Sequence, residues 1–419
     1  SSWGSGRRIW NGQVNQFPDG TLLRPLMSIV QEAGMRTGLV TTTTITHATP
    51  AGFAVNCVQR DLEGLIAENY LKAGVDILMG GGEQFFSPTS RKDRRDLLSE
   101  FAGAGYQVLR TRQHLLAVPA RGKVLGVFHP GHMPFTVDHV NDETLLRTKP
   151  SLAEMANTAL ANLKSSPDGF LLQIEGGRVA AGAHGNDLAA TLYDFFAFEE
   201  AVKAAVDFAM QDGETLVVIT ADHATGGLSL NGAGAEYIDS IAGLQTLAGM
   251  KASYGTLLKT AGEKPSPKKI REVVQERLSI ELSAAESKAV SAAAGGKPPF
   301  GISQFHKSVA ATLAMVLGNY TKVTWTGPNH TSDHVLVTAV GPGRGAFTGL
   351  TPNYRFFDLL LAAKGLKYEN PPQMDFETAK RHYAKLRLSM GSDRHLRERY
   401  ASQYDDRLGE AAEHRPLGC

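Results

Sequence analysis

Thr215–Gly227 reads TLVVITADHATGG, and this stretch decides how the rest of the chain is interpreted. It opens with an apolar, β-branched run, Leu216–Ile219, which is typical of a buried parallel strand. Open α/β sheets bind ligands just beyond the carboxyl ends of their strands, and here Asp222 and His223 follow the strand directly. An adjacent carboxylate and imidazole suit one metal ion. The alternative for a lone Asp-His pair is a turn cap beside a surface histidine.

A second predicted strand upstream also ends in polar residues. Phe170–Ile174 (FLLQI) leads into Glu175–Val179 (EGGRV). Asp187 then predicts the start of a long helix, with apolar residues at every third or fourth position, that ends at Gly213. We therefore expect residues 170–220 to form one βαβ unit. Its two neighbouring strands would present four side chains at one edge of a sheet: Glu175, His184, Asp222 and His223.

The segments EGGRV, NDLAATLYDFFAFEEAVKAAVDFA and TADHATGG resemble the alkaline phosphatase family in their order and spacing. Further segments agree with this resemblance: THATPAG (46–52) with Arg60, VDILMGGG (75–82), VLGVFHPGHMPF (124–135) and WTGPNHTSDHV (325–335). The likeness runs from about Trp3 to Lys367. It implies a single large α/β domain, a three-layer α/β/α sandwich with a mostly parallel central sheet.

The resemblance also implies an activity, a set of metals and a set of site residues. The family hydrolyses phosphate monoesters by attack of a serine and later hydrolysis of the phosphoserine, with two zinc ions and one magnesium ion at the site. The implied catalytic residues are Arg60, whose planar fork can bind two phosphate oxygens, and His47, which stands where some family members have Asp and others have His. The implied metal ligands are Asp222 and His223 for one zinc, His184 and His330 for the other, and Thr49 and Glu175 for magnesium.

Ala180 is a departure from the family pattern. Where the family has Asp as a zinc ligand in E-G-G-R-[IV]-D, this chain has Ala180, and a methyl group cannot bind a metal. Catalytic zinc takes about three protein ligands, but each implied site here keeps two, because the family's bridging Asp is also missing. One alternative is therefore a weakly active or inactive relative that binds metal or phosphate. Another is a phosphodiesterase or sulfatase of the same superfamily, although no C-x-P/A-x-R sulfatase motif is visible.

The first residues, SSWGSGRRIWNG, resemble the middle of a family motif. We therefore expect that residues 1–367 form an alkaline-phosphatase-like domain lacking its first strand and its nucleophile segment. The expected upstream sequence is an apolar strand ending in Asp and then a Thr-Asp-Ser-like motif, within about ten residues of Ser1. Ser1, Ser2 and Ser5 are alternative nucleophiles, but their alignment against Trp3 and Gly6 disfavours them.

Other parts of the chain carry less specific signals. Pro50 suits the first turn of a helix, which would carry Cys57 and Arg60; a solvated helix face is the alternative for that arginine. We interpret His129 and His132, which flank Pro130-Gly131, as part of a structural loop. A mostly helical insertion is expected at about 232–320. Residues 368–419 form a charged C-terminal tail, interpreted as a solvated extension and not as a binding arm.

Composition bears on the partners. The 43 Lys and Arg nearly balance the 42 Asp and Glu, for a formal charge of +1, which argues against binding to nucleic acid or to an anionic membrane surface. No apolar run reaches the ~18 residues of a membrane helix, and two cysteines form no disulfide framework. The expected partners are small phosphate-ester substrates, and a homodimer is compatible with the resemblance, which also suggests a periplasmic or secreted location.

Overall fold

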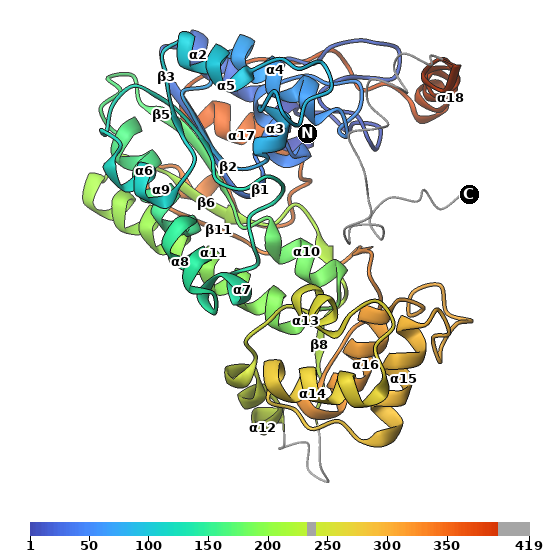
Figure 1. Cartoon of the computed structure of the whole chain (residues 1–419). Helices are drawn as coiled ribbons and strands as arrows, with labels where there is room; N and C mark the ends of the chain where they lie inside the picture. Colours follow the sequence, from blue (N-terminus) through green and yellow to red (C-terminus); the bar gives the residue numbers. More distant parts are fainter. Residues whose placement is uncertain (233–239, 393–419) are drawn as a thin grey trace.

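The computed structural model describes residues 1–232 and 240–392, without the side chains of 387–392. It contains a larger α/β body and a smaller helical body joined to it (Figure 1). The larger body is built on a five-stranded parallel sheet in the order β3-β4-β2-β1-β5. The strands are β1 (Arg36–Thr44), β2 (Ile77–Gly81), β3 (Tyr106–Leu109), β4 (Lys123–Val127) and β5 (Phe170–Glu175).

Helices cover both faces of this sheet. Alternate strand residues point to opposite faces, so Leu39 packs in one core cluster and Val40 in another. The helices on the first face include α2 (Leu26–Glu32), α3 (Ala48–Ala54), α4 (Glu63–Ala73), α5 (Leu97–Gly103) and α17 (Arg355–Ala363). Those on the second include α6 (Arg112–Ala117), α9 (Leu152–Leu163) and α11 (Leu188–Asp212). The expected three-layer α/β/α arrangement is confirmed.

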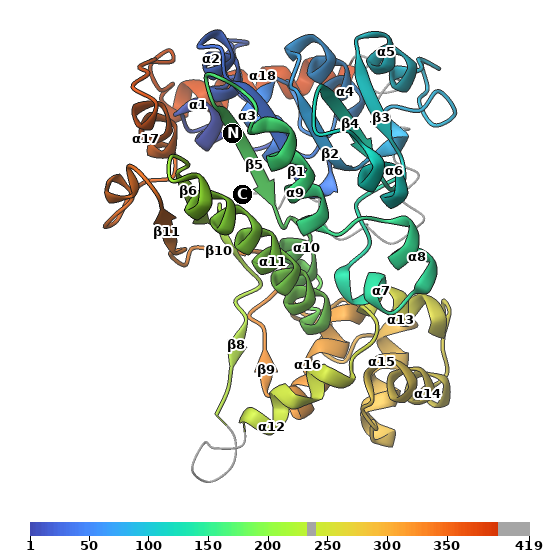
Figure 2. The ribbon, with the colours of Figure 1, turned by 90° about the vertical axis from the view of Figure 1, so that its left-hand side faces the viewer.

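The long helix α11 begins and ends where the sequence predicts. The Asp187 side chain accepts a hydrogen bond from the Ala190 amide, and Gly213 ends the helix with a φ of 74°. The strand that follows, β6 (Val217–Thr220), differs from the prediction. It is not hydrogen-bonded to β5 as in a βαβ unit but pairs antiparallel with β11 (Val337–Val340). The short apolar run therefore finds its backbone partner in a distant segment, beyond β5 (Figure 2).

The helix that begins near Pro50 is shorter than expected. It ends at Ala54, so Cys57 and Arg60 lie in the loop before α4 and not on the helix. The Asn15 side-chain amide donates to the carbonyl oxygens of Gly52 and Val55, at 2.7 and 2.8 Å. These bonds satisfy carbonyls at the helix end, which lets the chain leave the helix without an unpaired backbone group.

A helical body interrupts the sheet domain between β8 (Ser229–Leu230) and β9 (Val323–Thr324), which pair with each other. Its apolar core includes Leu257, Val274 and Leu313 and is shared with Val137 and Ala189 of the larger body. Its helices are α12 (Ser240–Gln245), η2 (Thr246–Gly249), α13 (Tyr254–Ala261), α14 (Pro267–Leu278), α15 (Ala284–Ala294) and α16 (Val309–Thr321). Residues 233–239 lie outside the described part.

Two buried or partly buried carboxylates fasten the helical body to the larger one. Asp138, on α7 (Thr136–Val140), accepts from the amide and hydroxyl of Ser253, at 2.9 and 2.7 Å. Asp187 accepts from the Tyr254 amide as well as from its own helix. Burial raises the pKa of Asp187 to about 7, and the nearby Asp138 and Asp194 carboxylates raise it further.

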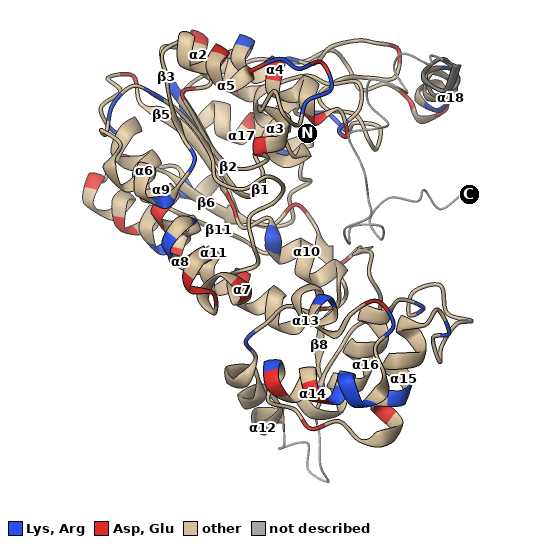
Figure 3. Ribbon diagram, viewed as in Figure 1, with Lys and Arg blue, Asp and Glu red and all other residues tan. Residues whose placement is uncertain are grey.

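The remaining elements are short. They are α1 (Ser2–Ser5), η1 (Glu83–Phe85), α8 (Glu143–Thr148), α10 (Arg178–His184), β7 (Ala224–Thr225), β10 (His330–Thr331) and η3 (Arg344–Ala346). Lys and Arg are interspersed with Asp and Glu over both bodies in the view of Figure 3. No described helix has both the length and the apolar character needed to cross a bilayer. Cys57 is buried with a free thiol, and Cys419 lies outside the described residues.

The chain after Lys367 does not begin as the solvated extension expected. Asn370 is 2% exposed and hydrogen-bonds to the N-terminal segment. A helix, α18 (Phe376–Ser392), follows. The amide of Asn370 needs buried partners, and it finds them in residues far away in sequence, which charge composition alone does not indicate.

Candidate active site

The carboxyl ends of β1 and β5 meet at one edge of the sheet. The two strands run parallel with Thr41 opposite Glu175, and the Thr41 hydroxyl donates to a Glu175 carboxyl oxygen at 2.5 Å. Burial raises the pKa of Glu175 to about 7, and the Asp222 carboxylate adds to this, whereas Thr41, Thr49 and Arg60 oppose it. The two predicted magnesium ligands, Thr49 and Glu175, are thus neighbours.

Arg60 is held by a histidine. Its Nη2 lies 3.0 Å from His47 Nε2, and the His47 ring meets the His132 ring edge to face, with centroids 5.7 Å apart. His132 accepts from the Thr44 amide through Nδ1 at 2.9 Å, and burial lowers its pKa to about 3. His132 thus makes a structural contact with β1 and packs against His47, which contacts the phosphate-binding candidate Arg60, a link the sequence did not indicate.

Three histidines come together beside Asp222. His223 Nε2 lies 3.4 Å from an Asp222 carboxyl oxygen. The rings of His223 and His330 stack with centroids 3.5 Å apart, and the His184 and His330 centroids lie 5.0 Å apart. Backbone pairing explains the meeting, because His330 on β10 lies opposite Thr225 on β7.

The surroundings of His330 favour its neutral form. Burial lowers the pKa of His330 to about 4, and the adjacent His223 and His184 rings lower it further. The Nδ1 atom of His184 lies 2.5 Å from the carbonyl oxygen of Pro328, which fixes the orientation of that ring. Neutral imidazole is the form that binds metals, and a partner on one ring nitrogen leaves the other for a metal.

The donor set is nevertheless incomplete for zinc. Among the described residues, no three His, Cys, Asp or Glu side chains come together as a group that could hold a metal ion. Ala180 lies on α10 one helical turn before His184, on the same face. The carboxylate of Asp187, three residues after His184, is committed to the amides of Ala190 and Tyr254. The residues present therefore fit zinc only as pairs.

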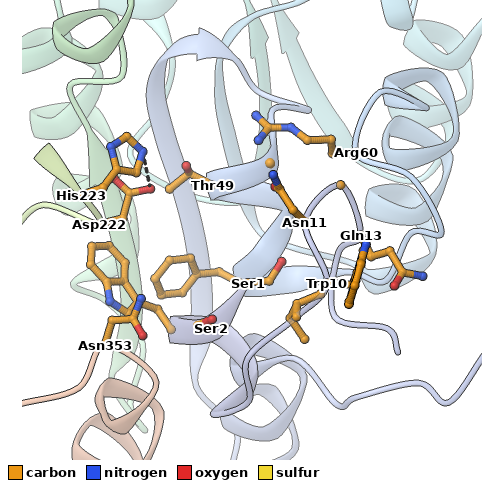
Figure 4. Close-up of a pocket in the computed structure, with 15 residues that line it drawn as sticks. Ser1, Ser2, Trp10, Asn11, Gln13, Thr49, Arg60, Asp222, His223 and Asn353 are labelled. Carbon is orange, nitrogen blue, oxygen red and sulfur yellow. Dashed lines mark ion pairs between the residues drawn. The ribbon is translucent and has the colours of Figure 1, made fainter. Parts of the chain in front are cut away.

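A single cavity of about 240 Å³ opens between these groups (Figure 4). Arg60, Thr49, Asp222 and His223 line it. The other lining residues come from the start of the chain, from α3 and from the loop before α17: Ser1, Ser2, Trp3, Ile9, Trp10, Asn11, Gly12, Gln13, Ala48, Phe53 and Asn353. Ser5, in contrast, is fully buried, and its hydroxyl donates to the Ser1 carbonyl. The volume is just below the ~300 Å³ at which drug-sized ligand pockets begin, which suits a small substrate.

Residues 13–366 match the family model described as alkaline phosphatase. The chain belongs to the alkaline phosphatase family. It is 32% identical over 355 residues to alkaline phosphatase 3 of Bacillus subtilis, covering 83% of this chain and 72% of that protein. It is 34% identical to the crystal structure of Thermus thermophilus alkaline phosphatase, with a TM-score of 0.84 over 92% of this chain and 82% of that one.

A relative with a narrower name is streptomycin-6-phosphate phosphatase of Streptomyces griseus. It is 32% identical over 266 residues, which is 53% of this chain and 59% of that protein. The family acts on phosphate esters and is metal dependent, and this chain is a phosphatase-type hydrolase by membership. The cavity wall at Ile9–Gln13 was not predicted as part of the site; the only signal was that WNG ends the family-like stretch SSWGSGRRIWNG.

Proposed function

We propose that this chain hydrolyses phosphate monoesters and that Arg60 binds the phosphoryl group. The observation that supports this proposal is the lining of one cavity by Arg60, Thr49, Asp222 and His223. A guanidinium has five N–H donors in a fixed plane, and the contact with His47 involves one terminal nitrogen. That contact orients the plane, while the remaining donors are available to the oxygens of a phosphate dianion.

The metal assignments belong to the same proposal. Asp222 with His223, and His184 with His330, would each contribute a pair of ligands to one of two zinc ions. Thr49 and Glu175 would supply oxygen ligands to magnesium, the donor type that hard cations prefer. Because a pair of ligands falls short of the three usual for catalytic zinc, water or the phosphate itself would complete each site. Zinc would supply the charge that stabilises the attacking and leaving oxygens.

The phosphoserine intermediate is proposed from the family resemblance. In the family a serine attacks the phosphoryl group, and the resemblance disfavours Ser1, Ser2 and Ser5 for that role. Ser1 and Ser2 nevertheless line the cavity beside Arg60, so the substitution Ser1→Ala tests them directly. The homodimer, the lack of nucleic-acid and membrane partners, and the periplasmic or secreted location also stay predictions.

A weakly active relative is the second candidate function, and Ala180 favours it. With methyl in place of carboxylate, the His184–His330 pair gains no negative charge to compensate the ion. Zinc at that pair would then be held loosely, and turnover would depend on added zinc.

The test is phosphate release from p-nitrophenyl phosphate with and without added zinc and magnesium. We expect hydrolysis that requires both metals and that inorganic phosphate inhibits competitively. Parallel assays with p-nitrophenyl sulfate and bis-p-nitrophenyl phosphate should give rates at least a hundredfold lower. A faster rate on the sulfate or the diester than on p-nitrophenyl phosphate would show that the chain is instead a sulfatase or a phosphodiesterase.

A further inference from the structure

The segment that links α17 to α18 lies outside residues 13–366, the part that matches the family model, yet it is fastened to the start of the chain. Asn370 accepts from the Arg24 amide at 2.7 Å and donates to the carbonyl oxygens of Ser5 and Arg24, at 2.8 and 3.0 Å. At 2% exposure it is a buried amide with both ends satisfied. Such an arrangement fixes the relative position of the segments it joins.

Gln373, three residues after Asn370, makes a second pair of hydrogen bonds to the start of the chain. The Arg8 amide donates to Gln373 Oε1 at 2.8 Å, and Gln373 Nε2 donates back to the Arg8 carbonyl at 3.0 Å. Arg7 adds a bond from Nε to the Pro371 carbonyl at 2.7 Å. The backbone from Ser5 to Arg8 is thus held by the C-terminal segment immediately before it enters the cavity wall at Ile9.

The helix α18 then contacts the wall itself. The Trp10 ring stacks on Phe376, with centroids 5.6 Å apart and planes at 28°, and lies 5.1 Å from the Tyr383 ring. Phe376 and Tyr383 are seven positions apart, hence on the same face of the helix. Trp10 lines the cavity together with Ile9, on the side formed by the start of the chain (Figure 4).

The lining of the cavity combines charged and aromatic residues. Arg60, Asp222 and His223 are suited to a phosphoryl group, while Ile9 and Trp10 supply apolar and aromatic surface in the same wall as Asn11 and Gln13. A phosphate monoester likewise has a dianionic end and an organic end. We propose that Trp10 determines specificity by contacting the organic group, and that the segment 369–383 is a positioning element that holds Trp10 in place.

This inference rests on the proposed function and narrows its substrate class. Planar apolar groups gain from contact with an indole face, whereas a small polyol gains little. The site should therefore prefer aryl or similarly flat phosphate monoesters over esters such as glycerol 2-phosphate. Loss of an aromatic contact changes affinity by about threefold to tenfold.

The first experiment compares kcat/KM for phenyl phosphate and glycerol 2-phosphate. Trp10→Leu should lower the ratio of kcat/KM for phenyl phosphate to kcat/KM for glycerol 2-phosphate about fivefold, mainly by raising the KM of phenyl phosphate. Trp10→Phe should recover part of the ratio, because it restores an aromatic face. An unchanged ratio, with both substrates affected equally or neither affected, would overturn the specificity role.

The second experiment addresses the positioning element. Tyr383→Ala and Gln373→Ala should shift the same ratio in the same direction by about twofold to threefold, and Tyr383→Phe should retain the wild-type ratio. The matched control is Lys385→Ala, an exposed residue on the opposite face of α18, which should leave the ratio unchanged. If Tyr383→Ala and Gln373→Ala give the same ratio as the control, segment 369–383 does not position Trp10 for substrate selection, and this part of the proposal is wrong.

Binding separates a failure of this inference from a failure of the proposed function. If the wild-type protein hydrolyses neither ester, calorimetry with phenylphosphonate and methylphosphonate replaces the kinetics. Weaker binding of phenylphosphonate alone in Trp10→Leu would support the inference without turnover. Equal binding of the two phosphonates by wild type, or binding of neither, would overturn it.

Discussion

The two halves of the active site are built on different parts of the sheet. The Arg60, Thr49 and Glu175 half follows β1 and β5, and eight of the nine residues of β1 are buried. The Asp222 and His223 half follows β6, all four residues of which are only half-buried, in a two-stranded ribbon with β11. One half is thus anchored in the main core, while the other depends on a local pairing, and we expect the two to respond differently to the same perturbation.

The same Val→Ala substitution, made in each half separately, tests most directly whether the two halves differ in packing. Val40→Ala on β1 removes a fully buried side chain and should cost about 2.5 kcal/mol of unfolding free energy. Val218→Ala on β6 is chemically identical but half-buried and should cost about 1 kcal/mol. Urea unfolding of both variants measures the difference. Equal costs would mean that β6 is as well packed as β1.

Removal of the Arg60 side chain should abolish most of the phosphate binding of this half of the site. Arg60→Ala should weaken inhibition by inorganic phosphate by about 2 kcal/mol, for a lost charge-assisted pair, and Arg60→Lys should recover only part of this. The inhibition constant of phosphate is the measurement. Arg121→Ala is the control, an exposed arginine before β4, at the opposite end of the parallel strands. An unchanged constant in Arg60→Ala would mark Arg60 as a surface residue.

An added carboxylate near His184 should strengthen zinc binding in the half of the site that contains the three histidines. Ala180→Asp places one a helical turn before His184 and should raise zinc affinity tenfold to a hundredfold, about 1.4 kcal/mol per factor of ten, with a matching rise in phosphatase activity. Zinc titration of phosphate release in both proteins gives the comparison. Ala181→Asp, the next position on α10, is the matched control because it points about 100° away. Identical zinc dependence in all three would show that the ligand comes from elsewhere.

The smallest effect should come from the titration of Glu175 in chelated protein. Its pKa is raised to about 7 in the folded state, so folding takes up a proton between about pH 4.5 and 7. Stability from this group is therefore complete below its unfolded pKa and is lost as the pH rises through 7. Partial exposure limits the change to below about 1 kcal/mol. The melting temperature of the wild type should be lower at pH 8 than at pH 5 because of this group. Glu175→Gln should lack this contribution.

Magnesium provides the complementary check on the same residue. A bound divalent cation stabilises the carboxylate, so adding magnesium at pH 8 should restore the melting temperature that wild type loses between pH 5 and pH 8. A gain of the same size in Glu175→Gln would place the magnesium at another group.

The comparison also indicates how far the sequence alone could lead. The strand-end pattern predicted that Glu175, His184, Asp222 and His223 lie at one edge of the sheet, because apolar runs ending in polar residues mark strand ends, and the family resemblance added His330. The partner of β6 was not predictable in the same way, since an apolar run shows that a strand exists but not which strand it pairs with.

Tertiary contacts account for the other differences. Arg60 left its expected helix because the Asn15 amide, far away in sequence, satisfies the helix end. The burial of Asn370 and the stacking of α18 on Trp10 also join distant residues. None of these contacts leaves a signal in its own segment, whereas the cap of α11 was predicted from the local residue Asp187.

The pairing of β8 with β9 brings the two ends of the helical body close together. The chain leaves the larger body and returns to it through two strands that are hydrogen-bonded to each other, at Ser229 and Thr324 (Figure 2). Any segment whose ends lie as close together as those of a hairpin could occupy this position without moving the sheet. The ribbon is therefore a natural site for exchanging one insertion with another of different length, and for replacing the helical body with a short turn to learn what it contributes.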